Sequence, residues 1–593
     1  MIVSGSLGSQ ILPEIQAWPQ LESVYVFCVN KSVHEQWAST IAKVKGVHTQ
    51  IDPIYKAIQI DHEHDDRAMT SINFNGIDTL FTYTQLLKET LLEIEDDNNE
   101  SIKEFVDYCR RQDTIAEDQI DKVEHEYSHH TPIWWYTAPY FLYSTLNHGL
   151  RLMDVDIIVK MIFFIRHLYQ HIEKLYRKQQ SNKNAMDPFQ VFRGQGLSVE
   201  DFYKMKQTKG GFMSFNSFLS TSRNREVSFE KFARPPAIRN PNLIGILFVM
   251  TIDPTLCAKS SIPFADITNQ GFFEVCEEEI LFTTHTIFRI DQIQRIHDDH
   301  TDRLWQVNLT LMGNDNDDLN NLTENIYPEL SRATGWSRFG SILMKLGESS
   351  KAEKLYKILL EMTLSDKNRG DYNNQLGFVY YKMDEYSKAL SSYEQSLEIR
   401  KKTLPPNHSD LAITYNSIGN VYRNIGEYSK ALSFYEQSLE IQKIALPPNH
   451  PALTVVYDKI GNMHKNVGDF LKAISSYQQA LEIKNTVLPP NHPNFAQSYN
   501  DIGSAYQNLR EYSKALKSFE QTLEIWKTVL PQNDSELATS YNNIGVVYYN
   551  KGEYSKALSF LEKAYEIDQK TLPPNHPHIA QSKKNIENIK KKL

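Results

Sequence analysis

The sequence predicts a multidomain protein in which a small α/β module is followed by an α+β domain and an all-α repeat solenoid. The chain has 593 residues, and at about 100 to 200 residues per domain this length corresponds to about three or four domains. Five blocks near the C-terminus repeat at a spacing of 42 residues, whereas the preceding part contains short β-like runs. A polar, turn-rich segment that begins GNDNDDLNNLTEN separates the part with β-like runs from the repeats, so we expect a linker over residues 313–327.

Composition limits the possible partners. Lys and Arg total 63 against 73 Asp and Glu, a net charge of -10, so the chain lacks the basic excess that binds nucleic acid. The most apolar stretch, residues 157–164, is far shorter than the roughly 20 apolar residues of a spanning helix, and we expect no membrane partner. The first twenty residues do not resemble a secretory signal. The cysteines form no CxxC, which favours a reducing, cytoplasmic setting: Cys28, Cys109, Cys257 and Cys276.

The first element is a module over residues 1–95. Residues 23–29 (SVYVFCV) and 46–51 (GVHTQI) have the apolar, β-branched character of strands. Residues 34–44 and 76–94 between and after them have helical periodicity. This alternation predicts a small α/β module, and it contains no glycine-rich phosphate-binding loop that would indicate its role.

The second element is a domain over residues 96–312. Helical patterns cover residues 101–112 and 138–180. Strand-like runs then follow at residues 189–194, 211–222, 243–252, 278–290 and 303–312. Helices followed by many strands predict an α+β domain.

Three separated motifs in this domain are candidates for chemistry. Arg193 ends the apolar strand QVFRG, Ser220-Thr221-Ser222 ends SFLSTS, and Glu277-Glu278-Glu279 runs into the strand ILF. In this order they resemble the R-S-E signature of arginine-modifying ADP-ribosyltransferases. The segment YFLYSTLNHGLR at residues 140–151 also resembles the one that precedes the arginine strand in that family. The resemblance implies an ADP-ribosyltransferase catalytic domain with NAD as co-substrate and no metal.

The chemistry of these residue types agrees with the resemblance. A guanidinium has forked donors that match phosphate oxygens, so Arg193 suits the diphosphate of NAD. The resemblance implies that the backbone of Gly194 holds the nicotinamide carboxamide and that Ser220, with Ser222 beside it, positions the adjacent ribose. Cleavage of the nicotinamide bond produces an oxocarbenium-like centre that a carboxylate stabilises. We assign that role to Glu279, acting through the ribose 2'-hydroxyl.

The acidic triplet also suggests the acceptor. In an extended strand the side chains of Glu277 and Glu279 point to one face, and that of Glu278 points to the other. Arginine stays protonated at neutral pH, so its guanidinium needs a base, and Glu277 can attract and deprotonate it. In the family, Glu at this place accompanies arginine as acceptor. Water in place of arginine would give an NAD glycohydrolase instead, and a third possibility is an adaptor whose transferase domain is inactive.

The third element is a repeat region over residues 328–593. Five glycines, Gly377, Gly419, Gly461, Gly503 and Gly545, lie 42 residues apart. Each block has two helical segments, and the LPPNHP type of loop ends the second because proline cannot continue a helix. A shorter block begins at Gly335, which makes about six repeats, and the charged C-terminal segment predicts a capping helix. The pattern resembles tetratricopeptide repeats of the kinesin light chain type.

The repeats are expected to bind a protein or peptide that is the transferase target or a scaffold. A row of polar residues follows the first helices of successive repeats: Asn373, Asn416, Asp458, Asn500 and Asn542. Stacked amides could hydrogen-bond an extended peptide, and a solvated polar ladder is the equal alternative. The histidines of the NHP loops recur with the repeat and lack a second ligand at metal spacing, so turn structure explains them better than zinc.

Overall fold

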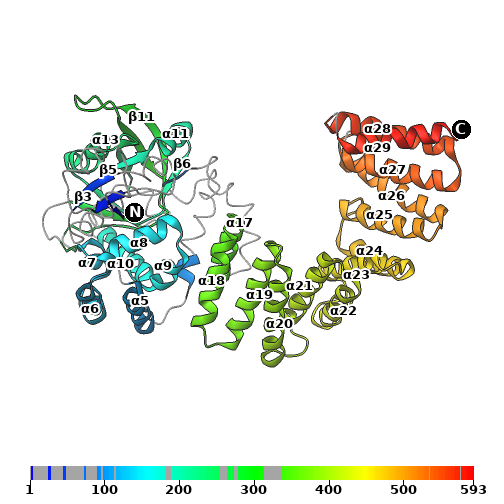
Figure 1. Cartoon of the computed structure of the whole chain (residues 1–593), viewed down its shortest axis with the longest axis horizontal. Coiled ribbons are helices and arrows are strands. Elements are labelled where there is room, and N and C mark those ends of the chain that lie inside the picture. The colour runs from blue at the N-terminus through cyan, green and yellow to red at the C-terminus, as the bar shows by residue number, and fades with distance from the viewer. Residues whose placement is uncertain are drawn as a thin grey trace. The chain divides into compact units, whose positions relative to one another are not determined.

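The structure is a computed structural model that separates into two compact units, Met1–Lys351 and Ala352–Leu593 (Figure 1). Each unit is described by itself below. The residues that the structure describes are 2–4, 24–27, 44–48, 72–74, 90–94, 98–112, 115–181, 188–253, 263–268, 270–272, 278–312, 335–532, 534–573 and 576–593.

The N-terminal part of the first unit contains a three-stranded parallel sheet. Its order is β1-β2-β3, with bounds Ile2–Ser4, Val24–Phe27 and Val44–His48. The strand predicted over residues 23–29 is confirmed as β2, and β3 covers the start of the one predicted over 46–51. The helix predicted over residues 34–44 lies outside the described residues, apart from Val44, which belongs to β3.

A group of helices follows. Its members are α5 (Asn98–Gln112), α6 (Glu117–Glu126), α7 (Pro132–Thr137), α8 (Phe141–Leu152), α9 (Val155–Lys160) and α10 (Ile162–Ser181). The helical pattern predicted over residues 138–180 is therefore three helices. Met153 ends α8 in the left-handed region at φ 50°, and the Asp154 side chain accepts hydrogen bonds from two backbone N–H groups at the start of α9.

The remaining strands of the first unit form one nine-stranded sheet with the order β4-β6-β11-β12-β8-β5-β7-β10-β9. Only β12 and β8 pair in parallel among these described strands. The bounds are β4 Ile72–Phe74, β5 Phe189–Ser198, β6 Phe212–Phe215, β7 Leu219–Ser222, β8 Leu243–Ile252, β9 Phe264–Asp266, β10 Glu279–Phe282, β11 Ile287–Arg295 and β12 Leu304–Leu311. A domain boundary at residue 95 would cut β4 from this sheet, because β4 pairs with β6.

Two layers of side chains pack on opposite faces of the central strand β8. Ile246, Phe248 and Met250 belong to the main core of the sheet, whereas Leu247 and Val249 pack against a second layer that includes Ala233 and Ala237. This second layer comes from a π-helical turn, η2 (Ser228–Ala233), and α13 (Arg234–Arg239). The short helix α11 (Val199–Gln207) adds apolar side chains to the main core.

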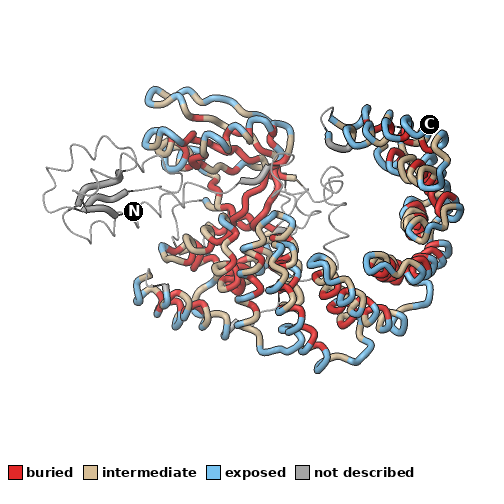
Figure 2. The backbone as a smooth tube through the Cα atoms, turned by 45° about the vertical axis from the view of Figure 1, so that its right-hand side comes forward, coloured by how far each residue is buried: buried red, intermediate tan, exposed pale blue. Residues whose placement is uncertain are grey.

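The second unit is a series of helical hairpins (Figure 1). The hairpins are α19 (Asp366–Lys382) with α20 (Tyr386–Thr403), α21 (Ser409–Ile425) with α22 (Tyr428–Ala445), α23 (Pro451–Asn466) with α24 (Phe470–Val487), α25 (Pro493–Asn508) with α26 (Tyr512–Val529), and α27 (Ser535–Lys551) with α28 (Tyr554–Thr571), followed by α29 (Pro577–Lys590). Figure 2 shows that buried residues run along the inside of the hairpins. None of the described helices is long and apolar enough to cross a membrane.

The repeated glycines mark the point where the two helices of a hairpin touch. A Cβ atom at Gly461 would lie 2.5 Å from the Tyr477 ring, and one at Gly419 would lie 2.7 Å from the Tyr435 ring. These glycines therefore allow the two helices of a hairpin to pack closely. The last helix, α29, buries Ile586 and Ile589 against the final hairpin, as expected for a cap.

The loop histidines cap helices. The Nδ1 atoms of His408, His450 and His492 accept hydrogen bonds of 3.1 to 3.2 Å from backbone N–H groups at the start of α21, α23 and α25. Asp534 does the same for α27. The prediction that these histidines serve turn structure is confirmed, because each histidine side chain accepts a hydrogen bond from a backbone N–H group that has no acceptor within its own helix.

The short hairpin that begins at Gly335 belongs mainly to the first unit. It consists of α17 (Gly335–Lys345) and α18 (Ser349–Met362), and the boundary between the units falls within α18. Arg338 forms a 2.8 Å ion pair with Glu93, and the Lys351 Nζ atom donates to the Leu152 carbonyl oxygen at 3.0 Å.

Candidate functional site

Sheet pairing brings the three chemical motifs of the first unit together. Strands β5 and β7 pair at a single position, Phe192 with Ser222, so they touch beside Arg193. Strand β10 runs antiparallel to β7 with Glu279 opposite Ser222. Arg193, Ser220 and Glu279 therefore meet, although 27 and 59 residues of sequence separate Ser220 from the other two.

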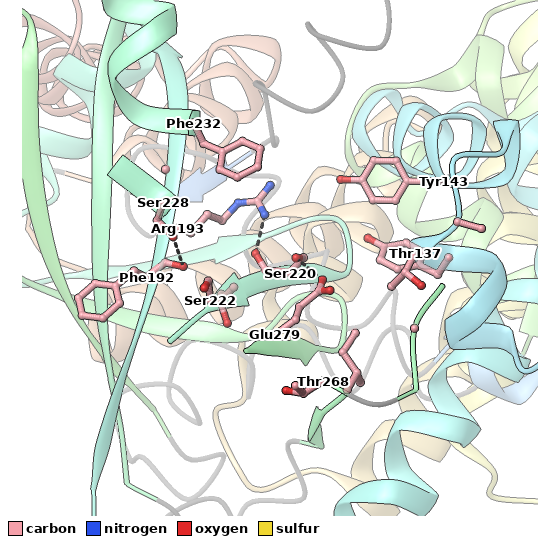
Figure 3. A pocket seen from close by; sticks show the side chains of 16 residues that line it. Thr137, Tyr143, Phe192, Arg193, Ser220, Ser222, Ser228, Phe232, Thr268 and Glu279 are labelled. Carbon is pink, nitrogen blue, oxygen red and sulfur yellow. Dashed lines mark hydrogen bonds between the residues drawn. The ribbon is translucent and has the colours of Figure 1, made fainter. Parts of the chain in front are cut away.

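Hydrogen bonds connect these three residues directly. The Arg193 Nη1 atom donates to the Ser220 carbonyl oxygen at 2.6 Å, and its Nε atom donates to the Gln195 Oε1 atom at 3.2 Å. The Ser220 hydroxyl donates to the Glu279 Oε1 atom at 2.5 Å. In Figure 3, Ser220 lies between the guanidinium and the carboxylate. Fixed partners of this kind hold the charged groups in one orientation before any ligand arrives.

The three residues line a cleft of about 370 Å³, a size in the range of small-molecule sites. The described lining residues are Tyr136, Thr137, Ala138, Tyr143, Phe192, Arg193, Gly194, Ser220, Thr221, Ser222, Ser228, Phe232, Ile267, Thr268, Gly271 and Glu279. Within this set Arg193 is the only cation and Glu279 the only carboxylate. Five predicted site residues, Arg193, Gly194, Ser220, Ser222 and Glu279, are thus in one cleft, and Glu277 lies outside the described residues.

Gly194 has a packing role that the sequence did not indicate. A Cβ atom at this position would lie 1.9 Å from the Ser228 carbonyl oxygen and 2.5 Å from the Ala233 backbone nitrogen. Both contacts are with the backbone of η2, which the Ser228 hydroxyl also ties to β5 through a 3.1 Å hydrogen bond to the Phe192 carbonyl oxygen. The absence of a side chain at Gly194 therefore lets η2 pack directly on β5. This packing role is independent of the backbone contact with nicotinamide that was predicted for Gly194.

Aromatic residues of the cleft were missed from sequence. Tyr136 and Tyr143 come from α7 and α8, and Phe232 comes from η2 (Figure 3). Phe232 keeps 36% of its surface exposed, which is high for a phenylalanine beside a packed sheet. For Tyr143, the only sequence signal of a role in the site is its place within the YFLYSTLNHGLR segment. Phe232 had no such signal, because π-helical turns such as η2 often mark functional sites but have no reliable sequence pattern.

Tyr136 is a buried neighbour of the charged pair. Its hydroxyl donates to the Phe218 carbonyl oxygen at 3.0 Å. Burial, and to a lesser extent Tyr143, raises its pKa well above the usual range. The Tyr136 hydroxyl is therefore a neutral hydrogen-bond donor in the cleft. It joins α7 to Phe218, the residue directly before β7.

The cleft wall opposite β5 is held by a contact between α7 and the segment after β9. The Thr137 hydroxyl oxygen accepts a 2.8 Å hydrogen bond from the Phe272 backbone N–H. A Cβ atom at Gly271 would lie 2.9 Å from the same oxygen, so a larger residue would displace the segment. The Phe272 ring packs against Trp134 at 5.2 Å between centroids.

The polar row of the repeats is largely engaged by neighbouring side chains. The Asn416 Oδ1 atom accepts from Lys459, Asp458 pairs with Lys484, and the Asn500 Oδ1 atom accepts from Asn543. Asn373 was assigned to this row incorrectly, because Asn374 is the residue 42 positions before Asn416. Asn373 is buried and donates to the Arg369 carbonyl oxygen at 2.9 Å. Asn416, Asp458 and Asn500 thus bind side chains of neighbouring helices, an arrangement that neither the peptide-binding nor the solvated-ladder hypothesis predicted.

Comparisons with known proteins identify the second unit. Two family models described as tetratricopeptide repeat match residues 368–444 and 453–528, and residues 537–578, respectively. A solved structure of putative kinesin light chain nearly identical TPR-like repeats from Podosopora anserina is 22% identical, covering 35% of this chain and 99% of that chain with a TM-score of 0.32. BtubC (BKLC) from P. vanneervenii is 21% identical, covering 39% of this chain and 92% of that chain with a TM-score of 0.33. No curated protein matches the chain. The matches of the two family models show that the second unit is built from tetratricopeptide repeats.

Proposed function

We propose that the first unit transfers ADP-ribose from NAD to arginine side chains of a protein and releases nicotinamide, and that the repeats recruit the target or a scaffold. The observation that carries the proposal is the meeting of Arg193, Ser220 and Glu279 in one cleft, with a hydrogen bond from the serine to the carboxylate. These residues were selected from the sequence as separate motifs, so their convergence supports the transferase reading. The expected reaction needs no metal.

Each charged group in the cleft has a task in this reaction. As the bond between C1' of the ribose and nicotinamide breaks, its electron pair leaves with nicotinamide and positive charge develops on the ribose. Glu279, oriented by the Ser220 hydroxyl, stabilises that charge. Arg193, held by Gln195 and the Ser220 carbonyl oxygen, supplies the positive charge that attracts the diphosphate. The arginine nitrogen of the acceptor then bonds to C1' and loses a proton.

Glu277 is proposed to take that proton, and replacing it separates the two halves of the reaction. In the variant Glu277→Gln, transfer to a small guanidine such as agmatine should fall at least about tenfold, because general-base help to a protonated guanidinium is lost. NAD hydrolysis should persist, because Glu279 remains. Labelled agmatine and released nicotinamide, measured in the same reaction, test this expectation.

The same measurement distinguishes the two catalytic alternatives. A parent enzyme that releases nicotinamide but labels neither agmatine nor protein is an NAD glycohydrolase, in which water takes the place of the guanidinium. Equal loss of both products in Glu277→Gln would contradict the division of labour between the two carboxylates.

The repeats give a second candidate function, that of a protein-binding adaptor. The observation that favours it is the match of tetratricopeptide repeat models to the second unit. Stacked helical repeats present an extended surface on which a peptide or protein can bind. An adaptor with an inactive first unit would bind its partner and cleave no NAD.

A truncation tests the recruiting role. Removing residues 364–593 should leave NAD hydrolysis and agmatine labelling within about twofold, while labelling of a natural protein target falls at least tenfold as local concentration is lost. The cut keeps α17 and α18, because Arg338 and Lys351 bind groups of the first unit. Mass spectrometry of labelled lysate proteins gives the readout, and undiminished protein labelling would contradict recruitment.

A further inference from the structure

The segment that follows β9 forms one wall of the cleft. The cleft lining includes Thr137 of α7 and three residues of this segment, Ile267, Thr268 and Gly271 (Figure 3). The chain turns here, since the Gln270 N–H donates to the Ile267 carbonyl oxygen at 2.9 Å. We call residues 267, 268 and 270–272 the wall segment. None of these residues is charged, so neutral hydrogen bonds and packing hold them in place.

Two hydrogen bonds fix the wall segment at its two ends. At the first end, the Ile267 N–H donates to the Glu279 carbonyl oxygen at 2.9 Å, so the wall begins on the strand that carries the proposed catalytic carboxylate. At the other end, the Phe272 N–H donates to the Thr137 hydroxyl oxygen at 2.8 Å. The Thr137 hydroxyl in turn donates to the Ile133 carbonyl oxygen at 3.0 Å. Thr137 therefore uses both its donor and its acceptor to tie the wall segment to α7.

Side chains pack around this second anchor. The Phe272 ring lies 5.2 Å from the Trp134 ring and 6.4 Å from the Tyr140 ring, between centroids. A Cβ atom at Gly271 would lie 3.4 Å from both Cβ and Cγ2 of Thr137, so the backbone of the wall segment rests directly on that side chain. The wall is thus packed and uncharged, which is the kind of surface that keeps water out of a reaction site.

Water is the competitor of arginine in the proposed reaction. Once nicotinamide has left, C1' of the ribose bonds either to a guanidinium nitrogen or to the oxygen of a water molecule. The first path releases a proton from the guanidinium and gives ADP-ribosyl-arginine, whereas the second releases a proton from water and gives free ADP-ribose. Exclusion of water from a reactive intermediate suppresses the second path.

We propose that Thr137 is a positioning residue that holds the wall segment against the cleft and thereby favours transfer to arginine over hydrolysis of NAD. Thr137 acts through the backbone of Phe272 and not on the reacting atoms. The inference rests on the proposed transferase function, and it assigns the choice between the two products to a contact between segments 135 residues apart.

The test compares the full-length parent with Thr137→Val, which keeps the branched shape and removes the hydroxyl. The ratio of labelled agmatine to released nicotinamide should fall at least about threefold, the effect of one lost hydrogen bond on the position of the wall segment. Nicotinamide release itself should stay within about threefold, because the contacts among Arg193, Ser220 and Glu279 are unchanged. Agmatine is kept at saturation, so a change in its affinity alone does not alter the ratio.

Two variants control for a merely structural role. Thr137→Ser retains the hydroxyl and should keep the parental ratio. Thr131→Val removes the cap of the same helix, because the exposed Thr131 hydroxyl oxygen accepts the Trp134 N–H at 3.2 Å. It should lower the melting temperature and leave the ratio unchanged, since Thr131 does not bind the wall segment.

Hydrogen exchange of the Phe272 amide gives a readout that needs no turnover. Mass spectrometry of peptides that contain this amide should show exchange at least about fivefold faster in Thr137→Val, because the acceptor of the N–H is lost. Thr137→Ser should exchange like the parent. Glu277→Gln, which is also expected to lower the ratio, should leave the exchange of the Phe272 amide unchanged.

The outcomes separate this inference from the function on which it rests. A parent that turns over NAD and labels agmatine, with an unchanged ratio or unchanged Phe272 exchange in Thr137→Val, would overturn the role of Thr137 alone. The same ratio change in Thr131→Val would also overturn it, since general destabilisation of α7 would then be the cause. A parent that releases no nicotinamide, or that labels no agmatine, would refute the transferase function and this inference together.

Discussion

Replacing Glu279 by Gln is expected to lower both NAD hydrolysis and ADP-ribose transfer at least about a hundredfold, because a preorganised negative charge beside the reacting ribose is lost. The fold should be retained, since the amide oxygen of Gln can still accept the hydrogen bond that Ser220 donates to Glu279. Nicotinamide release measured at saturating NAD gives the rate, and a thermal melt checks the fold.

Glu278 supplies the matched control for this experiment. It is adjacent to Glu279, its side chain is exposed, and its backbone carbonyl oxygen, which a substitution retains, accepts the Arg223 N–H at 2.9 Å. Glu278→Gln should therefore turn over NAD at the parental rate. Turnover of Glu279→Gln within a factor of two of the parent would remove the catalytic assignment.

Replacing Gly194 by Ala is expected to destabilise the first unit by about 3 kcal/mol or more, the upper end of overpacking costs. The new methyl group would overlap the Ser228 carbonyl oxygen, which is backbone and cannot rotate away. Thermal unfolding of the chain without residues 364–593 measures the effect on this unit alone.

Gly196→Ala, two residues along the same strand, is the graded control. Its Cβ atom would lie 2.8 Å from a ring carbon of Pro236 and 3.1 Å from a Leu243 methyl group, so both contacts are longer than the 1.9 Å contact at Gly194 and neither is with the backbone. A smaller loss of about 1 kcal/mol is expected. If Gly194→Ala melted like the parent and only NAD binding were weakened, the glycine would serve the ligand and not the packing of η2.

The repeat unit could be predicted almost completely from the sequence. Local features specify it: prolines end helices, small residues allow helices to touch, and the 42-residue period repeats the same hairpin. Each contact joins residues close in sequence, such as Gly461 with Tyr477, so the pattern carries the geometry. The longer strands of the first unit were predicted for a similar reason, since apolar runs with turns between them specify strands locally. The three-residue strands β1, β4 and β9 were not predicted.

Pairings between distant segments required the tertiary structure. The strand β4 was missed as part of the nine-stranded sheet because its pairing with β6 spans more than a hundred residues and leaves no local signal. The sequence named Arg193, Ser220 and Glu279 as separate motifs, but only the register of β5, β7 and β10 shows that they share a cleft.

What the sequence determined by itself is therefore the repeat architecture, the approximate strands and the residue types available for chemistry. What only the tertiary structure decided is which of those residues meet: the aromatic residues Tyr136, Tyr143 and Phe232 in one cleft, and the Lys459 ammonium on the side-chain oxygens of Asn416 and Asn420. Hydrophobic periodicity predicts which face of a helix or strand is buried. Contacts between side chains of distant segments depend on how those segments pack, and the pattern of a single sequence does not indicate this packing.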